Sequence, residues 1–167
     1  MTPSDENRAE ILSHIRYEIA HCFVVPAHNQ NDGHVRESLY LAMLIHARNL
    51  LDFFESTKRW NDDVICSDFG FPPSLVPIDH RERKRFNKDL LHLTYSRLRH
   101  TPDTKPWPVL AILQPLAVRA VDFMTHIVSH PPTGADTEEL KQWNALLELL
   151  TGGSWSSRGY TTHLFDR

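Results

Sequence analysis

Apolar residues recur at the three- and four-residue spacing of an α-helix along most of this 167-residue chain, and this periodicity constrains the fold most. Between residues 109 and 128 it produces a broad apolar face, made of Val109, Ile112, Leu113, Leu116, Ala120, Phe123, Met124, Ile127 and Val128. The chain has only 6 glycines, which argues against a hairpin-rich β fold and against a glycine-rich phosphate loop. The sequence therefore predicts an all-α helical bundle.

Capping residues and prolines divide this pattern into about five helices within a single domain, residues 1–167. The expected helices run from a Ser4 cap to before Pro26, from near Asp32 to about Ser56, from an Asp79 cap to before Pro102, from Pro106 or Pro108 to before Pro131, and from an Asp136 capping box to Gly152. Residues 60–77 form a long connection, whose aromatic side chains Trp60, Phe69 and Phe71 are expected to pack down. The tail, residues 154–167, either docks on the bundle or frays.

Composition and charge narrow the classes of function. The formal net charge of -3 gives no overall attraction to nucleic acid, so contact with RNA requires a local basic patch. The two cysteines, Cys22 and Cys66, are too few for a disulfide framework and fit a reduced compartment. The acidic N-terminus lacks the features of a signal peptide, and no uninterrupted apolar run has the length of a membrane span. We therefore expect a cytoplasmic protein without a membrane partner.

The predicted helix after Asp79 carries a polar stripe. Arg85 and His92 are seven positions apart, so on a continuous helix both lie on one face, about 10 Å apart along the axis. Phe86, Leu90 and Leu93 point to the opposite side. The same helix is locally basic, which predicts a phosphate-binding surface or simply a solvated face; its basic residues are Arg81, Arg83, Lys84, Lys88, Arg97 and Arg99.

The Arg85–His92 spacing resembles the Arg-x(4–6)-His signature of the HEPN superfamily of small helical proteins. Two segments strengthen this resemblance, residues 45–54 (IHARNLLDFF) and residues 87–95 (NKDLLHLTY), which look like a group of bacterial HEPN-like proteins. The similarity covers roughly residues 35–100. One departure is that Phe86 directly follows the arginine, whereas many active members have a polar residue there.

The resemblance implies a metal-independent endoribonuclease of toxin or phage-defence type that needs no cofactor. His92 would act as the general base and Arg85 would stabilise the phosphate, leaving a 2′,3′-cyclic phosphate. It further implies a homodimer joined through the Arg85–His92 helix, with RNA and an antitoxin protein as partners and no expected role for DNA. Substrate-binding or supporting residues would be Asn87, Lys88, Tyr95, Ser96, Arg99, His46 and Asn49.

Two alternatives remain open at the level of sequence. The chain resembles equally a non-catalytic HEPN-like module that binds RNA, a nucleotide or a protein. The second alternative is a metal-binding helical bundle similar to DinB-like proteins. It would use His126 and His130, which are four residues apart on one helical face, together with His46 from another helix.

Overall fold

The computed structural model describes residues 3–24, 33–58, 60, 62–90, 95 and 107–152. Within these residues it contains five α-helices, one 3₁₀ helix and no strand. The elements are α1 (Asp5–Phe23), α2 (Gly33–Glu55), the 3₁₀ helix η2 (Cys66–Phe69), α3 (His80–Lys88), α4 (Val109–Ser129) and α5 (Thr137–Thr151). The predicted all-α bundle is confirmed.

Three of the helices begin at the predicted N-caps. The side chains of Ser4, Asp79 and Asp136 each accept a hydrogen bond from a backbone N–H in the first turn of α1, α3 and α5. Such a bond satisfies one of the N–H groups that a helix leaves unpaired at its start. The capping box expected at Asp136 forms only in part, because the Glu139 carboxylate accepts two hydrogen bonds from Arg16, at 2.7 and 3.0 Å. Glu139 thereby joins α5 to α1.

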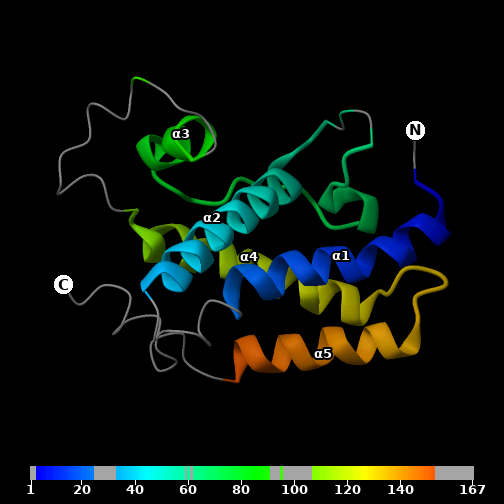
Figure 1. Ribbon diagram of the computed structural model, residues 1–167. Helices are drawn as coiled ribbons and strands as arrows, with labels where there is room; N and C mark the ends of the chain where they lie inside the picture. The colour runs from blue at the N-terminus through cyan, green and yellow to red at the C-terminus, as the bar shows by residue number, and fades with distance from the viewer. Residues whose placement is uncertain are drawn as a thin grey trace.

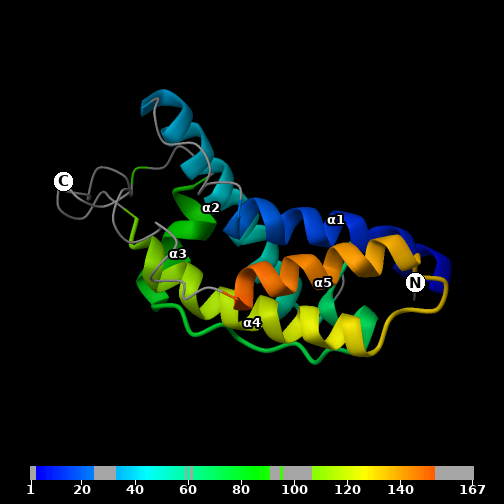
Figure 2. The ribbon, with the colours of Figure 1, turned by 90° about the horizontal axis from the view of Figure 1, so that it is seen from below.

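Helices α1, α4 and α5 lie along one another, with α4 antiparallel to the other two, and α2 crosses them (Figures 1 and 2). Packing contacts link α1 with α2, α4 with α5, α1 with α5, and α2 with α4. The short helix α3 lies outside this group, above α2 in Figure 1. Among the residues that the structure describes, α3 has one exposed side, which carries Arg81, Lys84 and Lys88.

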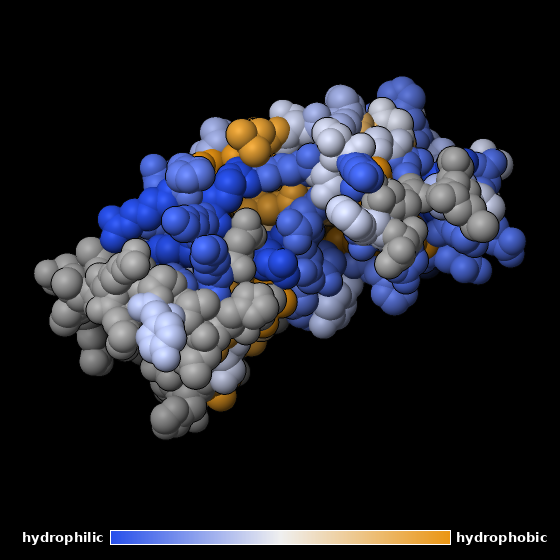
Figure 3. All heavy atoms as spheres, turned by 90° about the horizontal axis from the view of Figure 1, so that it is seen from above, coloured by the Kyte–Doolittle hydropathy of each residue, from blue (hydrophilic) through white to orange (hydrophobic). Residues whose placement is uncertain are grey.

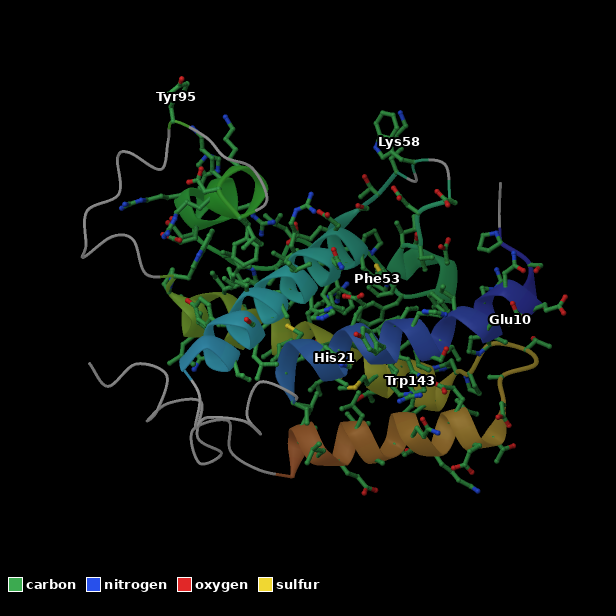
Figure 4. The ribbon with its side chains drawn as sticks, in the orientation of Figure 1. Glu10, His21, Phe53, Lys58, Tyr95 and Trp143 are labelled. Atoms are coloured by element: carbon green, nitrogen blue, oxygen red, sulfur yellow. The ribbon has the colours of Figure 1, made fainter. Side chains whose placement is uncertain are left out.

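An aromatic cluster fills the middle of the core. The ring of Phe123 on α4 lies 5.1–5.9 Å from five other aromatic rings, those of Phe53, Phe54, Phe69, Phe71 and Trp143. The aromatic cluster extends from Phe53 on α2 to Trp143 on α5 (Figure 4). Such edge-on pairs add to the stabilisation from burial. Phe69 and Phe71 confirm that the connection between α2 and α3 packs down, but the prediction for Trp60 was wrong, since 68% of it is exposed.

Helix α4 is apolar along most of its length. By length and composition alone it is long and apolar enough to cross a membrane, although Arg119 and Asp122 fall within it. The same composition is expected of a helix that is surrounded by others in a bundle. Here its buried side chains belong to the core shared with α1, α2 and α5.

Candidate functional site

Helix α3 begins as predicted but ends much earlier than expected. Its last residue is Lys88, and the N–H of Asp89 closes the final turn on the Arg85 carbonyl at 2.7 Å. Asp89 and Leu90 then form a turn. The prediction of one helix that continues to before Pro102 was therefore wrong. Consequently, the argument that a continuous helix places Arg85 and His92 on one face does not hold.

Arg85 points into the protein. Only 6% of it is exposed, and its Nη1 donates a hydrogen bond to Glu82 at 2.9 Å. Its guanidinium carbon lies 4.2 Å from the centre of the Trp107 ring, a cation–π distance. Phe86, also buried, meets the same ring edge-on at 5.1 Å. Arg85 and Phe86 thus fasten α3 to the segment that leads into α4.

Trp107 also receives a contact from α2. The hydroxyl of Tyr40 donates a hydrogen bond to the Trp107 carbonyl at 3.4 Å. Burial raises the pKa of Tyr40 to about 12, an effect that the positive charge of Arg85 opposes. Trp107 therefore connects α2, α3 and the start of α4. The sequence analysis missed this role, for which the only local signal was an aromatic residue between Pro106 and Pro108.

The exposed side of α3 is basic. We call Arg81, Lys84 and Lys88 the basic face of α3; all three are exposed, at the three- and four-residue spacing of one helical side. None of them makes an ion pair with any residue that the structure describes. Figure 3 looks down on this side and shows strongly hydrophilic side chains gathered over α3. Three of the six basic residues predicted for this surface are therefore exposed on α3, while Arg97 and Arg99 lie outside the described residues.

The other cations of α3 are neutralised by neighbours. Arg83 forms an ion pair with Glu55 at the end of α2 and donates a hydrogen bond to the Val76 carbonyl at 2.6 Å. Glu82 pairs with Arg85, so the two glutamates Glu55 and Glu82 are both directed at the inner arginines of α3. The basic face thus keeps its positive charge.

Tyr95 lies beyond the end of α3 and is 91% exposed. It points away from the bundle on the α3 side (Figure 4). An exposed aromatic ring is a surface on which a nucleobase can stack. His92, Ser96 and Arg99, together with the side chain of Asn87, lie outside the described residues.

His46 and Asn49 are held elsewhere, between α1 and α2. His46 Nδ1 lies 2.9 Å from Glu18 Oε2, and Asn49 donates a hydrogen bond to the same oxygen at 3.2 Å. Both residues thus bind a carboxylate of α1, and no contact joins them to α3 among the residues described. Their partner Glu18 was missed in the sequence analysis, because nothing local indicates which carboxylate a residue 28 positions away will meet.

His126 and His130 stack on each other at the end of α4, with ring centres 5.0 Å apart. The Nε2 atom of His126 lies 2.8 Å from the Phe69 carbonyl oxygen, which can only accept a hydrogen bond, so this nitrogen carries a proton. Within the described part of the chain, no group of three His, Cys, Asp or Glu side chains is placed to hold a metal ion. The structure therefore does not bring His46 together with His126 and His130.

Comparisons with family models, with curated proteins and with solved structures give no match to this chain. The resemblance to HEPN proteins, the homodimer and the assigned roles of individual residues stay predictions.

Proposed function

We propose that this chain is an HEPN-like RNA-binding protein and that the basic face of α3 contacts the RNA backbone. The observation that carries this proposal is the separation of charges on α3, whose inner arginines pair with glutamates while Arg81, Lys84 and Lys88 stay exposed. Phosphate contacts by lysine and arginine supply most of the affinity in sequence-independent binding.

The basic face is short and suits a few phosphates of one strand. Arg81 and Lys88 are seven positions apart, or about 10 Å at 1.5 Å per residue, and the three cations can contact about three phosphates at one phosphate each. The exposed ring of Tyr95 adds a surface on which a base can stack. The choice of RNA rather than DNA rests on the resemblance to HEPN proteins.

Cleavage is a narrower form of the same proposal, with His92 as the general base. In this form Arg85 cannot reach a phosphate without leaving Glu82 and Trp107, since only 7% of its side chain is exposed. Lys84 and Lys88 are the α3 cations already open to a phosphate. We therefore expect any phosphate stabilisation to come from these lysines.

The test is fluorescence anisotropy with an end-labelled single-stranded RNA across a salt series. Three phosphate contacts predict a slope of about -2 for log K against log salt concentration, at roughly 0.7 per contact. The triple variant Arg81→Ala, Lys84→Ala, Lys88→Ala should lose the slope and most of the affinity. Lys141→Ala, an exposed lysine on α5, is the matched control and should change neither.

The outcome that refutes RNA binding through α3 is a triple variant with unchanged affinity and salt slope. A DNA strand of the same sequence, run in parallel, tests the preference for RNA. Repeating the assay in excess chelator while following the labelled ends detects cleavage, and His92→Ala should then abolish it without weakening binding. Binding without cleavage supports the non-catalytic form.

A further inference from the structure

Three rings meet between α1 and α2, away from the basic face of α3. His21 stacks on Tyr17 with ring centres 3.7 Å apart, and His46 from α2 lies 5.4 Å from His21 and 5.7 Å from Tyr17. Figure 4 labels His21 near the C-terminal end of α1, where α2 crosses it. The proposed RNA-binding function uses none of these three residues.

Each histidine is fixed by a hydrogen bond from the same ring nitrogen. His46 Nδ1 faces the Glu18 carboxylate at 2.9 Å, and His21 Nδ1 faces the Tyr17 carbonyl at 3.0 Å. Both oxygen partners only accept hydrogen bonds, so each Nδ1 carries a proton. In the neutral rings, each Nε2 therefore holds a lone pair. Histidines that bind metals usually carry this second hydrogen bond, to a carboxylate or a backbone carbonyl.

We propose that His21 and His46 together bind one late first-row transition-metal ion, Zn²⁺, Ni²⁺ or Cu²⁺, through their Nε2 atoms. Two imidazoles that share an ion with metal–nitrogen bonds of about 2.0–2.1 Å, at a near-tetrahedral angle, have ring centres roughly 5 Å apart. The observed separation of 5.4 Å fits this geometry. Imidazole pairs select these ions over Mg²⁺ and Ca²⁺, which prefer oxygen ligands.

The site has two ligands from the protein. No third His, Cys, Asp or Glu side chain is placed with them among the residues that the structure describes, and water would fill any position that the protein leaves open. The side chains of His46 and Glu18 are 15% and 29% exposed, which leaves the ion access from solvent. The histidine pair on α4 differs, because the Nε2 atom of His126 already donates its proton to Phe69.

The test is isothermal titration of the tag-free full chain with ZnCl₂, and with CuCl₂ followed by electron paramagnetic resonance. We expect one ion per chain and nitrogen couplings from two imidazoles. His21→Phe, which keeps a ring against Tyr17, and His46→Gln, which keeps a hydrogen-bond donor for Glu18, should each weaken binding at least tenfold. Glu18→Gln should weaken it roughly tenfold or more, since it removes the carboxylate that orients His46.

Two control variants separate this site from other histidines. His14 lies two turns before His21 on the same side of α1, about 10 Å away, and His14→Ala is the first control. The second control, His130→Ala, removes one member of the histidine pair on α4. Both should bind the ion like the wild type. Thermal unfolding in chelator checks that every variant folds. The proposal is overturned if no saturable binding occurs, if binding survives in both His21→Phe and His46→Gln, or if His130→Ala abolishes it.

Discussion

Arg85 is the residue whose replacement most directly separates a structural role from a catalytic one. The side chain of Arg85 is 7% exposed and that of its partner Glu82 is 14% exposed, so Arg85→Ala leaves a nearly buried carboxylate without this cation. Breaking a buried ion pair from one side costs about 3–5 kcal/mol, and we take about 2–3 kcal/mol because solvent reaches part of Glu82. The lost cation–π contact with Trp107 adds about 1 kcal/mol.

The expected total is thus about 3–4 kcal/mol of unfolding free energy. For a chain of this size, 1 kcal/mol shifts the melting temperature by about 2–4 °C, so Arg85→Ala should melt roughly 6–16 °C below the wild type. Lys84→Ala, on the exposed side of the same helix, should stay within about 2 °C. Adding Glu82→Gln to Arg85→Ala should restore about 1–2 kcal/mol of the unfolding free energy, because the unpaired carboxylate of Glu82 is then replaced by a neutral amide.

Thermal denaturation followed by circular dichroism measures all three variants under the same conditions. If Arg85→Ala and Lys84→Ala both melt close to the melting temperature of the wild type, then Arg85 does not anchor α3 and the reasoning from its burial fails. If the expected loss is found, a loss of RNA cleavage in Arg85→Ala alone carries no information about catalysis. Activity must then be compared at a temperature where both proteins are fully folded.

Three further predictions test other parts of the structure. Arg16→Ala removes the two hydrogen bonds to Glu139 that join α1 to α5. Denaturation in guanidinium chloride should show that the unfolding free energy falls by about 1–2 kcal/mol, and an unchanged value would mean that the pair contributes nothing to stability. Gly70→Ala should lower the unfolding free energy by about 1–2 kcal/mol in the same assay, because Gly70 has a left-handed backbone with φ +73°. A clash is not the reason, since an added Cβ would lie 3.9 Å from the nearest side-chain atom. The pKa of Tyr40 is about 12 in the folded protein, whereas tyrosine in the unfolded chain ionises near pH 10. Between pH 10 and pH 12 the unfolding free energy should therefore fall by about 1–2 kcal/mol more in the wild type than in Tyr40→Phe. Equal pH dependence of the two proteins would contradict the burial of this hydroxyl.

The boundaries of the fold were predictable wherever a local signal determines them. Ser4, Asp79 and Asp136 cap their helices because a short polar side chain can reach a free N–H of the first turn without help from the rest of the protein. Pro131 lies just beyond the end of α4 for a similarly local reason, since proline lacks the N–H that another turn requires.

The end of α3 was not predictable in this way. Residues 89–93 contain no proline or glycine, and Leu90 and Leu93 continue the apolar spacing of Phe86. The helix nevertheless stops at Lys88, next to the contacts of Arg85 and Phe86 with Trp107. Those contacts join residues about 20 positions apart in the sequence, and a local pattern holds no information about them. The pairing of Glu18 with His46 escaped prediction for the same reason.

These long-range contacts decide which cations of α3 are exposed. Sequence spacing singled out Arg85 because it lies seven positions before His92, but burial turns Arg85 inward and leaves Arg81, Lys84 and Lys88 outside. An arginine already held by Glu82 and Trp107 has to give up both contacts before it can bind a phosphate, whereas the exposed lysines give up only water. A mutational study of this helix should therefore treat Arg85 as a stability residue and the basic face as the proposed RNA contact, and only the first of these roles predicts a fall in melting temperature.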